Sequence, residues 1–507
     1  MSVRSKKIQF VFIMLISLSG VSTLFADDPA EQNPFQQLPK TDTLKIDLQE
    51  AILTTLEHNP SLSIQRLAPK IAKTVVKEQG AIFDPAITAS VNKTKTKQQR
   101  FLGSQPNPFE LISDRSQYDA GISQNLPTGT TISANASISA SLSSIYSDQF
   151  SGNVGITVTQ SLLQGFGIGT NLANLRQAKI DYEISKAELK GVAEENIARV
   201  EQAYWSLYLT SEEINIQQRS LELADKQLKE SQERVAVGKL PELELAAVHA
   251  EVATRNEALI DAQSRYEQAR LNFLYLLNPS DQSFWEILPV LVDKPFLPVD
   301  TLDIVDVHDQ LGMKYRADLQ QARLSLQKGE IEITRTRNGL LPQLDFFITL
   351  GRTTYSKTFR DAVPDIRSPF YDINGGLTFN FPVTDRKAIA QFSRAKYTRE
   401  QLELSLKNME RLVQWDVRSA YIEVLRSKEQ ISATRVAREL QAKKLEAELE
   451  KFRVGRSTNF LVLQAQRDFT ASQLNEARSM VAYLNALVNL YLMEGTLLER
   501  RGIAGEM

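Results

Sequence analysis

The feature of this sequence that most constrains its fold is a long pattern that occurs twice. Ala178-Lys179 returns 217 positions later as Ala395-Lys396, and Val237-Gly238 returns at the same spacing as Val454-Gly455. The register holds without insertion or deletion. A repeat of this length is far longer than the roughly 20–50 residues of a solenoid unit. The pattern therefore predicts two copies of one large structural unit.

Each copy contains helical periodicity long enough for a hairpin of two very long helices. The first run extends from 171 to 237, which corresponds to about 100 Å at a rise of 1.5 Å per residue. Gly238 stands where a glycine commonly ends a helix. A returning helix then continues to 277 with heptad spacing that suits coiled-coil packing. The second copy repeats this arrangement over 385–498, with Gly455 at its turn.

Between 85 and 163 the periodicity changes to that of strands. Apolar residues alternate with polar ones, as in Ile132, Ala134, Ala136, Ile138, Ala140 and Leu142. Strict alternation predicts strands with one apolar and one polar face. A transmembrane barrel has this pattern, with lipid outside and a polar lumen. No run after the N-terminus approaches the ~20 apolar residues of a membrane-spanning helix, so strands are the elements that would enter a membrane.

The first copy contains one strand hairpin more than the second. Pro85 matches Pro342 at a spacing of 257, which is 40 positions more than the spacing of the helical hairpins. The added hairpin would turn at Leu126-Pro127-Thr128-Gly129, on the helix side. The longer segments 98–116 and 144–151 would then lie on the far side. Short turns toward the periplasm and long loops outside are typical of outer-membrane barrels.

Composition excludes several kinds of site. Because 59 Lys+Arg stand against 61 Asp+Glu, the charge balance argues against nucleic-acid binding. The absence of Cys excludes disulfides, thiolate metal sites and a lipid anchor on an N-terminal cysteine. The three histidines, His58, His249 and His308, are scattered. We therefore predict no cofactor, no metal and no catalytic residue, and expect that the protein is not an enzyme.

The N-terminus has the organisation of a secretory signal peptide over 1–26. Basic residues precede an apolar run from Ile8 to Leu24, and Ala26 supplies a small residue for cleavage. An uncleaved anchor is the alternative interpretation. Residues 27–43 are rich in Pro and Gln and predict an extended arm.

The repeats divide the rest of the chain into alternating helical and strand segments. We expect a first repeat over 44–277, a linker with one short strand over 278–305, a second repeat over 306–498 and a tail over 499–507. Within the first repeat we expect helices over 46–80, barrel strands over 86–163 and a helical hairpin over 171–277. The first helical segment should break at Asn59, because the proline that follows disfavours helix in the residue before it. Within the second repeat we expect a helix over 306–338, barrel strands over 343–383 and a helical hairpin over 385–498.

Several short segments carry a resemblance to a known family. They are QSLLQGFG at 160–167, FPV at 381–383, the hairpin tips RVAVGKL at 234–240 and FRVGRS at 452–457, and FLVLQAQ at 460–466. With the doubled order of elements, they resemble the TolC-type outer-membrane efflux proteins, also called outer membrane factors, over 44–498. The resemblance implies an α+β membrane protein with an internal duplication. A homotrimer would form one outer-membrane β-barrel, continued by a long antiparallel α-helical coiled-coil tunnel in the periplasm of a Gram-negative bacterium.

The resemblance also implies a function and partners. The protein would be the passive exit duct of a tripartite efflux or type I secretion system. A periplasmic adaptor (membrane fusion protein) would open it and link it to an inner-membrane pump of the RND, ABC or MFS type. Outer-membrane lipid is a further expected partner. A trimer is also favoured physically, since even eight strands leave a barrel interior filled with side chains and open sheet edges cannot lie in lipid.

Two alternatives stay open at this point. A secreted coiled-coil scaffold with a soluble β-domain would share the helical pattern but would lack a lipid-facing apolar band. Within the channel class, family members usually contribute four strands per protomer, whereas six are predicted here. The barrel would then have 18 strands, or the added hairpin would lie outside it.

The resemblance assigns the adaptor-docking tips to the two hairpin turns. The residues are Val237, Gly238, Lys239 and Leu240 in the first copy and Val454, Gly455, Arg456 and Ser457 in the second. The alternative is that both glycines merely end helices with a positive φ.

The periplasmic gate would lie at the start of the last long helix, at Phe460, Leu461, Gln464 and Arg467. Residues three or four apart share a helix face, so these side chains would form stacked rings around the axis. Leu461 and Gln464 stand where the family often has aspartates, which argues against strong cation binding at the entrance. Packing of Phe460 against its partner helix is the alternative.

Lys93, Lys95 and Lys97 share one face of the first predicted strand. They would form a basic ring in the lumen or at its mouth, or belong to a solvated loop beyond the membrane.

Overall fold

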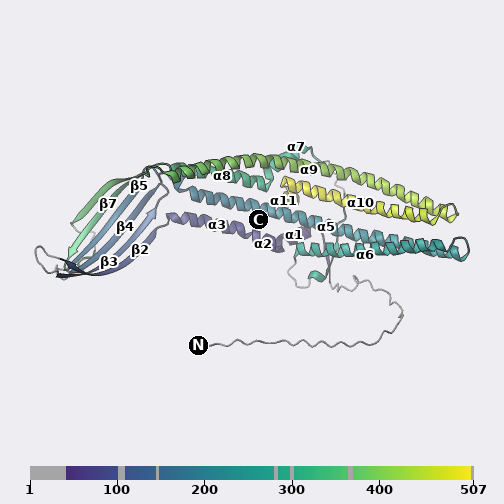
Figure 1. Ribbon diagram of the computed structural model, residues 1–507, viewed down its shortest axis with the longest axis horizontal. Helices are drawn as coiled ribbons and strands as arrows, with labels where there is room; N and C mark the ends of the chain where they lie inside the picture. Colours follow the sequence, from purple (N-terminus) through teal and green to yellow (C-terminus); the bar gives the residue numbers. More distant parts are fainter. Residues whose placement is uncertain are drawn as a thin grey trace, which may run out of the picture.

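The structure is a computed structural model that describes residues 42–100, 109–143, 148–278, 284–296, 302–363 and 369–503. The predicted signal peptide and most of the predicted arm lie outside these residues. Figure 1 shows an elongated molecule with a sheet at one end and long helices that extend from it to the other end. Strands and helices therefore occupy separate zones, as the change of periodicity predicted.

Six strands form one antiparallel sheet in the order β2-β3-β4-β5-β7-β8. The first repeat supplies β2 (Ala86–Arg100), β3 (Phe109–Asn125), β4 (Thr130–Ser143) and β5 (Gln149–Ser161), and the second supplies β7 (Gln343–Ser356) and β8 (Tyr371–Asn380). The repeats join where β5 pairs with β7. The additional hairpin β3-β4 thus lies inside the sheet, between β2 and β5. β2 and β3 also continue as paired strands into both ends of the segment 98–116, where a loop was expected.

The tight turn between β3 and β4 lies against the strand-to-helix junction. Gly129 has φ +87°, a conformation that favours glycine. A Cβ at Gly129 would lie 2.2 Å from the carbonyl oxygen of Gly165, in the segment after β5. The turn is therefore on the helix side of the sheet, as the sequence predicted, and only glycine fits there.

The pairing register gives the sheet one apolar and one polar face. One continuous row across all six strands is apolar: Ile87, Ile122, Ala134, Ile156, Leu350 and Ile373. A neighbouring row on the opposite face is polar: Ser90, Asp119, Ser137, Asn153 and Thr353. The apolar row is open to the surroundings, since Ile87 is 81% and Ile373 65% exposed. Apolar side chains on a strand face normally seek a core or lipid, and no second layer formed by the described helices and strands covers this face (Figure 1).

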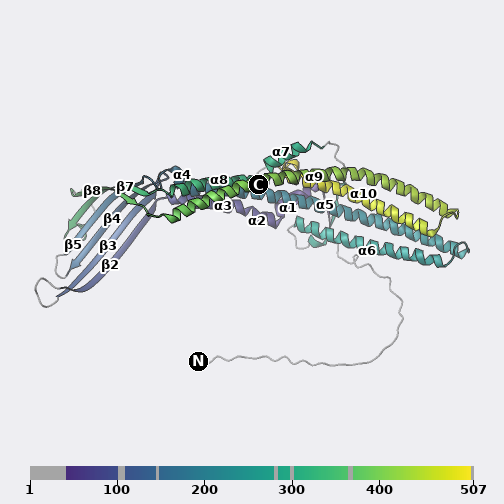
Figure 2. The same ribbon diagram turned by 45° about the horizontal axis from the view of Figure 1, so that its top comes forward.

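Two long helical hairpins extend from the sheet. The first consists of α5 (Ala173–Ala236) and α6 (Leu243–Leu277), and the second of α9 (Arg386–Arg453) and α10 (Asn459–Glu494). Corresponding helices of the two hairpins end 217 positions apart, so the repeat seen in the sequence is a repeat of structure. Figures 1 and 2 show the hairpins side by side, with both turns at the end farthest from the sheet. The polar contacts between α5 and α10 described below hold them together.

A small parallel pair of strands lies at mid-length beside α5. It consists of β1 (Asp42–Ile46) and β6 (Ile287–Leu291). The Tyr204 hydroxyl of α5 donates to Ile46 O at 3.5 Å and accepts from Asp293 N at 3.1 Å, which ties both strands to the helix. Burial raises the pKa of Tyr204 to about 12. Sequence analysis expected one short strand in the linker but not its partner β1, because five residues are too few to show a period.

The shorter helices differ from expectation at two points. The first helical segment is divided into α1 (Leu48–His58), α2 (Pro60–Gln65) and α3 (Leu67–Gly80). The break at Asn59 was predicted; that at Arg66 was not. The single helix expected over 306–338 is two, α7 (Val305–Tyr315) and α8 (Ala317–Asn338). They separate at Arg316, whose guanidinium binds Asp318 at 3.0 Å and Asp416 at 2.6 Å. Short elements complete the fold: η2 (Ala81–Phe83), α4 (Ile168–Asn171), η3 (Phe284–Glu286) and α11 (Leu497–Arg500).

The main hydrophobic core lies at mid-length and draws on both repeats. Tyr204, Phe273, Leu319, Val417 and Leu490 are all fully or almost fully buried in it. Full burial of one such side chain stabilises the fold by about 1.5–3 kcal/mol. The two repeats therefore form one folding unit rather than two separate domains.

The junction between sheet and helices is held by side-chain amides. Asn338, at the end of α8, accepts from Gly165 N at 2.7 Å and donates to Leu163 O at 3.3 Å. Asn171 donates to Gly165 O at 2.7 Å. The two bonds of Asn338 join the repeats at the base of the sheet, and that of Asn171 holds the junction segment within the first repeat.

Candidate functional site

The turns of the two hairpins form an exposed tip. Val237 and Val454 are 66% and 69% exposed. Gly238 and Gly455 have φ of +70° and +75°, and no atom lies within 4 Å of a Cβ placed on either. Helix termination therefore accounts for both glycines, while both valines leave most of their surface exposed in the protomer. The remaining predicted tip residues are the exposed Lys239 and Arg456 and the half-buried Leu240 and Ser457.

The four predicted gate residues lie on one exposed face at the start of α10. Phe460 is 66% and Leu461 43% exposed, and Gln464 and Arg467 are exposed on the following turns. The residues between them on the opposite face are buried: Val462, Leu463, Ala465 and Gln466. With 66% of its surface exposed, Phe460 is not buried by its own protomer. The structure thus brings the four residues together on one surface.

Beside this face, a buried polar cluster joins the two hairpins. Asn459, the first residue of α10, accepts from Gln227 Nε2 at 2.9 Å and from Ser231 Oγ at 3.2 Å. Its own Nδ2 donates to Glu244 Oε2 at 3.1 Å. Asn459 is 3% exposed. We call Asn459, Gln227, Ser231 and Glu244 the inter-hairpin cluster; it fixes the gate end of α10 to α5 and α6.

Two ion pairs continue this connection along α10. Arg467 lies 3.5 Å from Glu251 of α6, and Arg478 lies 2.8 Å from Glu213 of α5. Both glutamates are buried, with side chains 5% exposed. Each glutamate also has a cation in its own hairpin, with Arg255 at 2.7 Å from Glu251 and Arg265 at 3.3 Å from Glu213. The two pairs therefore add charge attraction between the hairpins but are not the sole partners of the buried carboxylates. The predicted gate residue Arg467 is therefore also a link between hairpins.

Sequence analysis missed the inter-hairpin cluster and one carboxylate near the gate. Asn459 and Gln227 are separated by 232 residues, and no local pattern signals contacts at that distance. Asp468 lies one turn beyond Gln464, and its carboxylate is bound to Lys444 of α9 at 2.7 Å. Because Lys444 offsets the charge of Asp468, this carboxylate does not add a free negative charge to the surface next to Gln464.

The structure corrects one part of the interpretation of Lys93, Lys95 and Lys97. They belong to β2 itself rather than to a loop. The register places them on the apolar face, because Val91, two residues before Lys93, pairs with Tyr118 of that face. They therefore lie on the face opposite to the polar row through Asp119.

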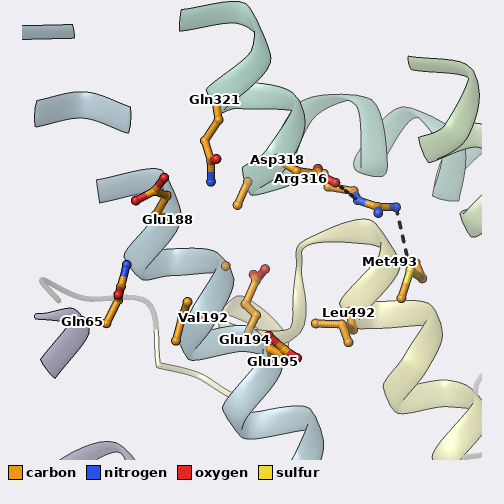
Figure 3. Close-up of a pocket in the computed structure, with 12 residues that line it drawn as sticks. Gln65, Glu188, Val192, Glu194, Glu195, Arg316, Asp318, Gln321, Leu492 and Met493 are labelled. Atoms are coloured by element: carbon orange, nitrogen blue, oxygen red, sulfur yellow. Dashed lines mark hydrogen bonds and ion pairs between the residues drawn. The ribbon is translucent and has the colours of Figure 1, made fainter. Parts of the chain in front are cut away.

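A cavity of about 440 Å³ lies at mid-length between α5, α8 and the end of α10 (Figure 3). Glu194 and Gln321 extend into it from opposite sides. Burial raises the pKa of Glu194 to about 7. The Lys190 ammonium, 3.8 Å away, offsets part of this effect. Lys190 itself donates to the carbonyl oxygens of Tyr315 at 3.3 Å and Gly495 at 3.1 Å.

The C-terminal segment is anchored to the middle of α5 by a second buried carboxylate. Arg501 donates to Glu201 Oε1 at 2.7 Å and to Oε2 at 2.6 Å. The Glu201 side chain is fully buried. Burial raises the pKa of Glu201, while the hydrogen bonds and charge of Arg501 act in the opposite direction.

Two kinds of feature are absent from the described residues. None of the helices that the structure describes has both the length and the apolar character needed to cross a membrane. The described part of the chain also contains no group of three or more His, Asp or Glu side chains placed to hold a metal ion.

The chain is similar in structure to outer-membrane proteins, among them the outer-membrane channels OprN and CmeC. OprN is similar with a TM-score of 0.68 at 15% identity, over 94% of this chain and 98% of that one. VceC from Vibrio cholerae has a TM-score of 0.66 at 14% identity, over 88% and 96%. CmeC from Campylobacter jejuni has a TM-score of 0.64 at 15% identity, over 89% and 86%. At these identities the likeness establishes the fold.

The family assignment comes from the sequence. No curated protein matches the chain. The family model described as outer membrane efflux protein matches residues 51–278 and 313–496, which include both repeats. The matched segments contain the sheet, both helical hairpins and both tips. The chain therefore belongs to the outer membrane efflux protein family, and its place is the outer membrane.

Proposed function

We propose that three copies of this chain form a passive duct through the outer membrane, the exit of a tripartite efflux or type I secretion system. The observation that carries this proposal is the six-stranded sheet, whose apolar face is exposed and whose outer strands β2 and β8 each have one neighbour. The N–H and C=O groups of an open edge find no partner in lipid. Pairing β2 of one copy with β8 of the next removes both edges.

Exposed apolar side chains on the adjoining helices support the same closure. α3 leads into the β2 edge, and α9 follows the β8 edge on the opposite side of the protomer (Figure 1). Exposed on α3 are Leu67, Ile71 and Val75, and on the end of α9 nearest the sheet Ile389, Tyr397 and Leu404. Head-to-tail contact between identical copies forms a closed ring when the rotation closes. The two stripes would then cover each other at each of the three interfaces.

The position of β3 and β4 inside the sheet favours a wide barrel. Three copies of a six-stranded sheet would give 18 strands, which lies within the range of outer-membrane barrels. Barrels of about 16–18 strands enclose an aqueous channel. The polar face would line it, as the row through Asp119 and Asn153 suggests. A soluble scaffold, the alternative function, would leave the apolar face exposed to water.

Gating would involve separation of the two hairpins at their tips. The face with Phe460, Leu461 and Gln464 would close the periplasmic entrance, and the inter-hairpin cluster would hold it closed. An adaptor that binds the tips at Val237 and Val454 would pull α9 and α10 outward. The adaptor would link the duct to an inner-membrane pump of the RND, ABC or MFS type.

Electron microscopy of the detergent-extracted protein tests this proposal. We expect a three-fold particle with a barrel of 18 strands above a stalk of helical hairpins, and ion conductance in planar bilayers. A monomer that stays soluble without detergent would contradict the duct. A three-fold particle with 12 barrel strands would contradict only the strand count.

A further inference from the structure

The apolar face of the sheet carries an aromatic cluster toward the end away from the helices, with Leu142 and Ile112 as the apolar residues that follow it on this face. The ring of Phe359, from the segment after β7, lies 5.7 Å from that of Tyr118 and 6.3 Å from that of Phe150. Tyr118 and Phe150 belong to the apolar face, since they pair with Ile138 and Ala140 of β4. Aromatic side chains concentrate where the hydrocarbon core of a bilayer meets its head groups. The cluster therefore lies near the outer boundary of the lipid-facing band.

Basic side chains follow directly beyond the cluster on the same face. Lys93 is the next residue of that face after Val91, which pairs with Tyr118. Lys95 and Lys97 continue the column outward along β2. We call Lys93, Lys95 and Lys97 the basic rim.

Acidic neighbours offset only part of this charge. Lys93 lies 3.7 Å from Asp114, and Lys97 lies 2.7 Å from Glu110. Both carboxylates come from β3, so three ammonium groups stand against two carboxylates on this corner of the sheet. The side chains of Lys93 and Lys97 are still 69% and 61% exposed. An ammonium has three donors, which leaves each lysine able to bind a second anion outside the sheet.

We propose that the basic rim binds the phosphate groups of lipid head groups in the outer leaflet, with the lipid chains lying against the apolar rows below it. This inference rests on the proposed barrel. A lysine on the lipid face is costly at the middle of a bilayer and nearly neutral at its interface. Lysine and arginine near a membrane surface attract anionic lipid. The rim lies next to the aromatic cluster, which places its lysines at the membrane interface. At this level a lysine costs little and is close to anionic head groups.

Lipid enrichment around the intact trimer tests the inference. The full chain is reconstituted in nanodiscs with equal amounts of phosphatidylglycerol and phosphatidylcholine, and the lipids that stay bound are counted by mass spectrometry. We expect enrichment of phosphatidylglycerol of about threefold or more around the natural protein, since each basic side chain near the surface contributes attraction. The triple variant Lys93→Gln, Lys95→Gln and Lys97→Gln should lose most of this enrichment.

Three controls distinguish lipid binding by the basic rim from an effect of net charge and from binding of free phosphate. Lys226→Gln, Lys428→Gln and Lys443→Gln, on exposed positions of the long helices, change the net charge equally and should keep the enrichment. Replacing the rim lysines by Arg should also keep it. Inorganic phosphate added to nanodiscs of phosphatidylcholine alone should leave the melting temperature unchanged; a rise confined to proteins with the rim would point to free phosphate and overturn the lipid assignment.

Conductance of the same preparations distinguishes this inference from the proposed function. A conducting trimer with equal enrichment in the natural protein and the rim variant would overturn the lipid site and leave the duct intact. A preparation that forms neither a trimer nor a conducting pore would overturn the duct, and the lipid site with it.

Discussion

Gln227 of α5 donates a hydrogen bond of 2.9 Å to the side chain of Asn459, the first residue of α10. The bond is buried and links the two repeats one residue before Phe460. A buried polar group that loses its partner costs about 1–3 kcal/mol. The proposed gate is therefore attached to the neighbouring hairpin by bonds that must break if α10 moves away.

Asn459→Ala is expected to favour the open state. It removes the acceptor for Gln227 and Ser231 and the donor to Glu244, and thereby weakens the closed arrangement. Conductance of single trimers in planar bilayers should rise relative to the natural protein. Asn215→Ala removes an exposed amide that bonds only to Glu212 among the contacts described for it, and should leave conductance unchanged. Equal conductance of all three proteins would contradict a role of the cluster in closing the entrance.

Gln464→Asp should introduce cation binding at the entrance. Three carboxylates would face one another around the axis of the trimer, and like charges at close range favour bound cations. We expect multivalent cations to block the channel at concentrations about tenfold or more below those needed for the natural protein. Gln401→Asp, on an exposed position of α9 far from the tips, is the matched control. No change in block by Gln464→Asp would remove this residue from the proposed gate.

Arg501→Ala should destabilise the protein strongly. It leaves the fully buried Glu201 carboxylate without the guanidinium that binds both of its oxygens. Removal of one partner of a buried ion pair costs about 3–5 kcal/mol. The melting temperature should fall, and less so at acidic pH, where Glu201 accepts a proton. The double variant Glu201→Gln with Arg501→Ala should recover part of the loss; equal melting of the single variant and the natural protein would show that the pair contributes nothing.

The buried Glu194 predicts a loss of stability with rising pH. Its pKa is raised from 4.5 to about 7, so between these values the folded state holds a proton that the unfolded state has released. Stability from this group is therefore complete below pH 4.5 and declines as pH rises through 7, by on the order of 3 kcal/mol. Glu194→Gln should flatten that part of the melting-temperature profile. Glu195→Gln, on the exposed neighbour, should retain it.

The sequence predicted more of the fold than of the candidate site. The gapless repeat predicted two equivalent hairpins, and α5 and α9 do end at equivalent residues, Ala236 and Arg453. The alternation through Ile132 and Ala134 predicted a two-faced strand, which β4 is. The break at Asn59 was predicted from the proline that follows it. These features are local, because helix and strand periodicity acts over a few neighbouring residues.

The candidate site depended on contacts that no local pattern records. The proposed gate residues were assigned from resemblance, whereas the inter-hairpin cluster around Asn459 was not predicted, because its members come from three helices. Asp468 was overlooked for a related reason: its effect depends on Lys444, on the other helix of its hairpin.

The sequence by itself determined the duplication, the type of each long element and the presence of an additional hairpin. Only the tertiary structure decided which faces meet. Lys93 and Ile87 both occupy odd-numbered positions of β2 and therefore share one side of the strand. The alternation within β2 does not show whether this side belongs to the apolar or the polar face of the sheet. The register with Tyr118 and its neighbours decided it. The physical reason is that periodicity assigns a side chain to one of two faces, whereas pairing with other strands determines what surrounds that face.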